Sequence, residues 1–264
     1  MQKNISIKGL TLFYDASNEN SVELIQKACE KSIRIIQEHL GLELPKDCRV
    51  YIMTSWFQLF QSVPWFWKIL LTVTIPFWAL RVKKIWPFVG GWEQKFGQRR
   101  IVGVKPPRLL QLADRKIGDR IFIKEKNIEE KVQNITCHEL THAFTSHLRL
   151  PIWLKEGLAM IMVDKFFKKT TVQKNTLEIL QKSSGSYSGY DGYRFKDKDA
   201  LVYLYARGYW LTRYIEETQP ELLKDLLTKR YRKSELEENI AKVYGKKKNE
   251  FWNEIDLILV SYFK

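Results

Sequence analysis

The sequence predicts an α+β fold, with a small mixed sheet and some helices near the N-terminus and an all-helical C-terminal part. Short β-type runs occur only before residue 124, and from residue 128 onward apolar residues recur at helical spacing. The composition, 45% hydrophobic and 28% charged, is that of an ordinary globular protein. We therefore expect one unit over 1–264, with an α+β subdomain at 1–127 and a helical subdomain at 128–264.

The cysteine content narrows the class of protein. Three thiols, Cys29, Cys48 and Cys137, are too few for a disulfide-stapled secreted module or for a zinc site of four thiolates. The first ten residues contain no apolar signal region. We expect a reducing, cytoplasmic setting, with peripheral association with a membrane for the reason given below.

Apolar residues at alternate positions predict strands, and apolar residues three or four positions apart predict helices. Strands are expected at 6–13, 48–53, 100–104 and 120–123, and an amphipathic helix at 20–40 that ends at Gly41. The Gly-, Ser- and Tyr-rich residues 183–198 predict a loop. Helices are expected at 128–148, 152–167, 199–217, 221–229, 234–244 and 248–263.

Tryptophan and positive charge are concentrated in one region. Six of the nine Trp lie in 56–92, and residues 81–120 contain eleven Lys and Arg against three Asp and Glu, in a chain of net charge +14. Residues 69–80 carry no charge, but Pro64, Pro76 and Pro87 are expected to break any long helix. The uncharged run 69–80, within the segment 63–90, is thus too short and too interrupted to predict a membrane-spanning helix.

Two features of this region favour a re-entrant or interfacial segment. Trp rings prefer the headgroup level of a bilayer, and a neighbouring basic cluster attracts anionic lipid. A membrane surface, contacted through 56–92 and the basic residues 81–120, is therefore the expected partner. A buried apolar hairpin and a groove for a partner protein are the alternatives. No nucleic-acid partner is expected, because the aromatic residues are embedded in aliphatic ones and no binding motif accompanies them.

The candidate metal-binding and catalytic residues begin in the helix predicted at 128–148. His138-Glu139-Leu140-Thr141-His142 is an H-E-x-x-H motif. Imidazoles at positions i and i+4 share one helix face and can converge on one metal ion. Glu139 is then placed to reach a metal-activated water. Cys137 points about 100° away from His138 and is expected to be buried packing.

A third ligand is expected, because hydrolytic zinc usually has three protein ligands and one open position. His39 lies on the first helix, and His147 is rotated by about 140° from His142. The next acidic residue is Glu156, on a helix that begins after Pro151 and has a largely apolar surface. A metal would pair this carboxylate, whereas the alternative leaves Glu156 exposed beside Lys155.

HELTHAF at 138–144, followed by PIWLKEGLA at 151–159, resembles the gluzincin zinc metallopeptidases, in particular the compact peptidase MA-like domains. ALVYLYARGYWLTRYIEE at 200–217 and VYGKKKNEFWNEI near the end are similar to the later helices of those domains. The resemblance covers roughly residues 95–264, and 63–90 is expected to be an insertion. It implies a zincin-like fold whose central helix carries the H-E-x-x-H motif.

By that resemblance, His138, His142 and Glu156 bind one zinc ion per chain and Glu139 is the general base. Tyr205 is the candidate for stabilising the oxyanion, with Tyr203 and Tyr209 as rivals. The Asp that these families place four residues after the third ligand is replaced here by Met160, and Asp164 lies one turn further on. The residue that orients the ligands therefore stays unassigned.

Two hypotheses follow. The first is a zinc-dependent peptidase in which Glu139 and the metal activate water and an edge strand, 121–123 or 101–104, pairs with an extended substrate. The alternative is a membrane-surface binding protein whose zinc site is structural or vestigial. An open fourth coordination position favours the first hypothesis, and a closed four-ligand site favours the second.

Overall fold

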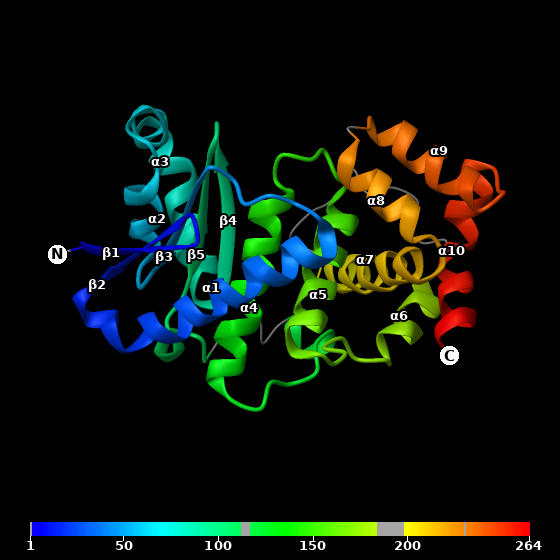
Figure 1. Cartoon of the computed structure of the whole chain (residues 1–264), viewed down its shortest axis with the longest axis horizontal. Helices are drawn as coiled ribbons and strands as arrows, with labels where there is room; N and C mark the ends of the chain where they lie inside the picture. Colours follow the sequence, from blue (N-terminus) through cyan, green and yellow to red (C-terminus); the bar gives the residue numbers. More distant parts are fainter. Residues whose placement is uncertain (1, 112–116, 184–197, 230) are drawn as a thin grey trace. The chain divides into compact units, whose positions relative to one another are not determined.

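The computed structural model describes residues 2–111, 117–183, 198–229 and 231–264. It is mixed α+β, with a small five-stranded sheet near the N-terminus and a mostly helical remainder (Figure 1), as the sequence predicts. The chain forms two compact units, which we describe separately. Unit 1 contains Met1–Arg115 and Lys124–Phe144, and unit 2 contains Lys116–Ile123 and Thr145–Lys264. The loop predicted at 183–198 lies almost entirely outside the described residues.

The sheet of unit 1 has the strand order β1-β2-β3-β5-β4 and is mixed. The pairs β1–β2 and β4–β5 are antiparallel, whereas β2–β3 and β3–β5 are parallel. The strands are β1 (Gln2–Ile7), β2 (Leu10–Asp15), β3 (Asp47–Ile52), β4 (Gly91–Phe96) and β5 (Arg99–Val104). The predictions at 48–53 and 100–104 are confirmed, each within one residue.

The single strand predicted at 6–13 is wrong. The chain forms a hairpin there, because Lys8 and Gly9 both have positive φ, 43° and 92°, in a two-residue turn. Such a turn matches the twist of antiparallel strands, and glycine adopts its backbone angles without strain. The turn splits one expected strand into β1 and β2.

The strand predicted at 120–123 is also wrong. Residues Gly118–Arg120 form a 3₁₀ turn, and Phe122 makes only an isolated bridge to Val172 in unit 2. The strand beside β5 is instead β4, which the sequence analysis missed. No residue of β4 is fully buried, and Gln94 and Lys95 are exposed, so the apolar alternation is weak.

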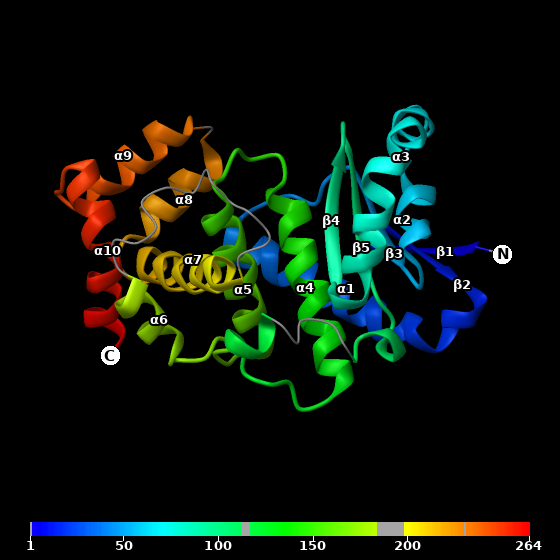
Figure 2. The same cartoon turned by 180° about the vertical axis from the view of Figure 1, so that it is seen from behind.

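The two faces of the sheet are covered by different helices. Helices α1 (Glu19–Leu40) and α4 (Ile128–Thr145) lie on one side, and α2 (Trp56–Ser62) and α3 (Trp65–Ile85) lie on the other (Figures 1 and 2). Helix α1 matches the prediction at 20–40 and ends at Gly41, whose φ of 64° closes it. On the α3 side, a core of Tyr51, Met53 and Ile101 is flanked by aromatic rings of β2 and β4 and by Trp86, directly after α3.

Helix α3 crosses the position at which the sequence predicted a break. The segments Trp65–Ile75 and Ala79–Phe88, the second of which includes the 3₁₀ turn Trp86–Phe88 after α3, are bent by 94° relative to each other. Pro76 stands between them in the sequence and removes one backbone donor, so the chain bends and stays helical. Within the described ranges, no single helix is long and apolar enough to cross a membrane, although this bent pair passes by length and composition.

In the described residues of unit 2, the secondary structure is helical apart from the bridge at Phe122. Five of the predicted helices are confirmed with ends shifted by at most one residue, and α4, in unit 1, stops at Thr145 rather than at 148. The short helix α6 was not predicted. The helices are α5 (Ile152–Phe167), α6 (Thr176–Ser183), α7 (Lys198–Thr218), α8 (Pro220–Thr228), α9 (Lys233–Val243) and α10 (Lys248–Phe263).

Candidate metal centre

Helix α4 presents both histidines of the H-E-x-x-H motif on one face. Its opposite face is buried and contains Cys137, Leu140 and Phe144, so the helix is fixed in rotation against the rest of unit 1. His138 and His142 are half-buried. The expectation that Cys137 is buried packing is confirmed, and burial raises the pKa of its thiol to about 12.

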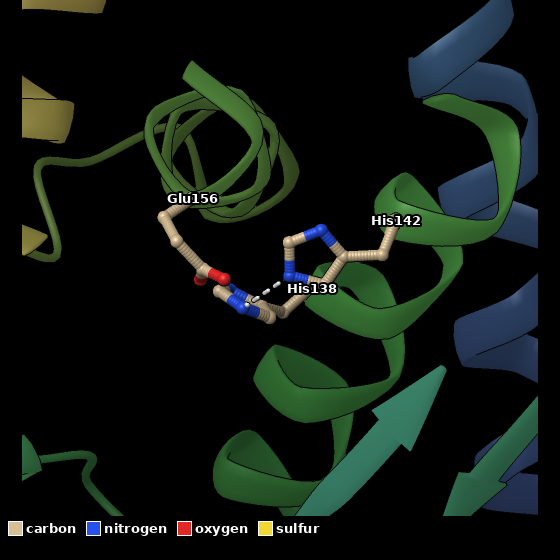
Figure 3. A group of neighbouring side chains, drawn as sticks. All are labelled: His138, His142 and Glu156. Carbon is tan, nitrogen blue, oxygen red and sulfur yellow. Dashed lines mark hydrogen bonds between the residues drawn. The ribbon is translucent and has the colours of Figure 1, made fainter. Parts of the chain in front are cut away.

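The two rings converge. The Nε2 atoms of His138 and His142 are 3.0 Å apart, and the ring centroids are 4.7 Å apart. A carboxylate oxygen of Glu156 joins them, and the three candidate ligand atoms all lie within 4.8 Å of one another. In Figure 3 the Glu156 carboxylate, carried by α5, points toward the two imidazoles of α4.

The donor set fits zinc. With Zn–N bonds of about 2.0–2.1 Å and a tetrahedral angle, two imidazole nitrogens should stand about 3.3 Å apart. The observed 3.0 Å is close to this spacing. Two unprotonated nitrogens at that distance would repel, so the pair needs either a shared proton or a cation. Among the described residues the group contains three ligands, the number that leaves one coordination position open.

Glu156 is held in place by a close crossing of α5 and α7 inside unit 2. A methyl group at Gly157 would stand 2.1 Å from the Thr212 hydroxyl oxygen and 2.3 Å from the Gly208 carbonyl oxygen. A methyl group at Gly208 would stand 2.5 Å from the Trp153 carbonyl oxygen. Only glycine permits this contact, which fixes the turn of α5 next to Glu156. Glu156 itself is half-buried rather than exposed beside Lys155.

Glu139 lies against the edge strand of the sheet. A methyl group at Gly91, the first residue of β4, would stand 2.6 Å from a side-chain carbon of Ile135 and 2.7 Å from Cγ of Glu139. The absence of a side chain at Gly91 therefore lets α4 approach β4 at the candidate general base. Because β4 pairs only with β5 in the described sheet, Glu139 sits beside a strand with one unpaired side.

The rival tyrosines are engaged elsewhere. Tyr203 donates a hydrogen bond to Asp256 at 2.5 Å, and Tyr209 donates one to Asp164 at 2.6 Å. Both are buried, whereas Tyr205 is half-buried on α7. Tyr203 and Tyr209 thus each have a carboxylate partner away from the candidate ligands.

Met160 and Asp164 do not supply the missing orienting residue. Met160 is fully buried. Asp164 accepts hydrogen bonds from the Thr171 hydroxyl at 2.6 Å and from Tyr209, which joins the end of α5 to the following turn. Burial raises the pKa of Asp164, although these hydrogen bonds favour its charged form. Its role is to close the end of α5.

The remaining histidines lie outside the group. His39, on α1, and His147, after α4, are both exposed. Gly91, Gly157 and Gly208 were not predicted from the sequence. The available signals of close backbone approach are a glycine at the start of a strand for Gly91 and a glycine directly after a candidate ligand for Gly157.

Comparison with known proteins adds no assignment. The sequence matches no model of a known protein family, and it matches no curated protein at a significant level.

Proposed function

We propose that the chain is a zinc-dependent peptidase of the gluzincin type with a zincin-like fold. One observation supports this most: the side chains of His138, His142 and Glu156 converge on one point, and their donor types suit zinc. A mixed sheet with an antiparallel edge strand beside the H-E-x-x-H helix is consistent with the proposal.

Zinc held by these residues supplies a Lewis acid that polarises a peptide carbonyl and makes water more acidic. Glu139 then takes a proton from the attacking water at a carboxylate oxygen and passes it to the amine that leaves. The close approach of β4 to Cγ of Glu139 at Gly91 limits the positions that this side chain can take. Restriction of this kind is what general-base catalysis requires.

The substrate is an extended polypeptide that pairs with the open side of β4. Strand addition of this type uses main-chain hydrogen bonds. The strand begins beside Glu139, so a paired peptide passes close to the base. This replaces the edge strands expected from the sequence, since residues 101–104 lie inside β5, which has neighbours on both sides. Tyr205 is the proposed donor to the oxyanion.

The proposal is tested by metal content and hydrolysis together. The purified chain should contain close to one zinc and cleave a quenched fluorescent casein. Glu139→Gln should retain the zinc and lose hydrolysis by about 100-fold or more. Glu178→Gln, a change at an exposed glutamate of α6, is the matched control and should behave as wild type. Wild-type hydrolysis by Glu139→Gln would refute the mechanism.

The second candidate, a membrane-surface protein with a structural zinc site, is favoured by the exposed apolar residues of α3. X-ray absorption spectroscopy of the zinc-loaded chain separates the two functions. Two imidazoles and one carboxylate with a water favour the peptidase, and a fourth protein ligand favours the structural site.

A further inference from the structure

Helix α3 exposes large apolar side chains to solvent, which is energetically unfavourable. Trp65 is 74% exposed, Val73 72% and Leu80 77%. On the first arm of the helix most of the exposed apolar residues share one face, at positions 65, 66, 69, 70 and 73, and Trp67 lies beside it. A solvent-facing helix face is normally polar. Contiguous exposed apolar surface of this kind marks an interaction site.

The kinds of side chain along α3 favour a lipid bilayer as the occupant. The exposed apolar residues are aromatic in the first turn, where Trp65 and Phe66 lie, and aliphatic at Val73 and Leu80 on either side of the bend. A bilayer accepts both kinds, because aromatic rings prefer its interface and aliphatic chains its hydrocarbon.

The positive charge of this region favours anionic lipid headgroups as the partner. Residues 48–92 contain no Asp or Glu. Arg81, Lys83 and Lys84, at the end of α3, are all exposed. Basic residues next to an apolar segment are attracted to anionic lipid. The bent arms are each about 15 Å long, about half of a hydrocarbon core, so the bend at residues 76–78 can lie within one leaflet.

The helix is attached firmly to the sheet of unit 1. The ring of Trp67 contacts Phe96 at the end of β4, with centroids 5.8 Å apart. The ring of Trp86 contacts Trp92 near the start of β4, with centroids 5.0 Å apart. Trp92 in turn lies against Gly103 of β5, where a methyl group would stand 2.5 Å from its ring. Both ends of α3 are therefore fixed to the edge strand.

We propose that α3, with the basic residues 81–84, is a docking element that inserts its exposed apolar face into one leaflet of an anionic lipid bilayer. The inference goes beyond the proposed hydrolysis and does not depend on it. It assigns a function to the Trp-rich insertion, which the metal centre does not use.

Vesicle co-sedimentation of the full chain tests the proposal. Wild type should pellet with vesicles of phosphatidylcholine and phosphatidylglycerol, and less with phosphatidylcholine alone. The double variant Val73→Glu/Leu80→Glu should lower the partition coefficient by about 100-fold or more, because two deeply inserted apolar side chains are lost. The matched control is Leu257→Glu, at a residue of α10 that is 53% exposed, and it should pellet as wild type.

The charge contribution is tested separately. Reversal of Arg81, Lys83 and Lys84 to Glu should weaken binding to the anionic vesicles by about 100-fold or more, with little effect on neutral ones. The matched control reverses Lys27, Lys224 and Lys229, which are similarly exposed and lie elsewhere. Equal losses in both triple variants would mean that net charge, rather than this docking element, drives binding, and would overturn the proposal.

Two further results would overturn it. One is wild type that stays in the supernatant with both kinds of vesicle. The other is a stable dimer, seen by sedimentation velocity, that Val73→Glu/Leu80→Glu dissociates without any change in vesicle binding. Zinc content and casein hydrolysis, measured on the same preparations, report on the peptidase proposal independently.

Discussion

Gly91 determines how closely the edge strand approaches the candidate base. No other residue type fits there, because the nearest atoms are side-chain carbons of Ile135 and Glu139, which belong to a packed helix. The absence of a side chain at Gly91 thus lets β4 lie close to Cγ of Glu139. The residue carries no chemistry of its own and acts by leaving space.

We predict that Gly91→Ala destabilises the chain by about 1–3 kcal/mol and reduces hydrolysis by more than its loss of folded protein explains. The added methyl group must displace Glu139 or β4. Urea unfolding and casein hydrolysis measure the two effects.

Gly97→Ala is the control for that prediction. Gly97 has a φ of 60°, so alanine costs backbone strain, but a methyl group there meets no atom within 4 Å. It should lose stability and keep the activity of its folded fraction. Unchanged activity in Gly91→Ala would contradict the role assigned to the contact.

Cys48 is buried in β3, and burial raises the pKa of its thiol to about 12. Above pH 9 the thiol ionises in the unfolded chain and stays neutral in the folded one, so its contribution to stability is present below pH 9 and is lost as the pH rises toward 12. The stability difference between wild type and Cys48→Ala should shrink by about 1.4 kcal/mol from pH 8 to pH 10. Urea titrations at the two pH values measure it, and a constant difference would contradict the prediction.

At the scale of elements, α7 and α10 are joined by a buried ion pair. Nε of Arg207 lies 2.8 Å from Oδ1 of Asp256, and both side chains are almost fully buried. Tyr203 donates a hydrogen bond to the same carboxylate. The guanidinium also donates to the Trp252 carbonyl oxygen and lies against the Trp252 ring. The pair therefore fixes the register of two helices within unit 2.

Asp256→Ala should cost about 3–5 kcal/mol of unfolding free energy, because it leaves the Arg207 charge buried without its carboxylate. The double variant Arg207→Met/Asp256→Leu should recover part of this loss, since it removes both charges together. Denaturant unfolding of the three proteins checks both statements. A loss below about 1 kcal/mol in Asp256→Ala would show that water reaches the site.

Local patterns were sufficient to predict most elements. Five helices of unit 2 show apolar residues at helical spacing, and their ends were placed within a residue, whereas the short helix α6 was not predicted. Strand β4 was missed because its character comes from pairing with β5 rather than from its own sequence. Helix α3 was expected to break at Pro76, but a bend accommodates the missing donor.

The candidate site could be predicted only in part for the same reason. The spacing of His138 and His142 is a local property of one helix, so their convergence follows from the sequence. The contact of Glu139 with Gly91 joins residues 48 positions apart, and the crossing at Gly157 and Gly208 joins residues 51 apart. Contacts between distant segments depend on the whole packing arrangement, which periodicity does not encode.

At the scale of the whole molecule, zinc binding should stabilise the folded chain. A ligand that binds only the folded state adds about 2.7 kcal/mol when its free concentration is 100 times its Kd. We predict that zinc raises the Tm of wild type, and that His138→Ala abolishes this rise. His147→Ala, at an exposed histidine outside the group, should respond as wild type. Calorimetry with and without zinc measures the shifts, and an equal rise in His138→Ala would place the metal elsewhere.

The attachment of α3 to both ends of β4 has a consequence for selectivity. An enzyme confined to the same surface as its substrate meets that substrate at a high effective concentration, of order millimolar for short tethers. Weak pairing of the substrate with β4 then suffices for binding. Main-chain hydrogen bonds depend little on which side chains the substrate carries. Under the two proposals together, selectivity comes from where a polypeptide resides more than from its sequence.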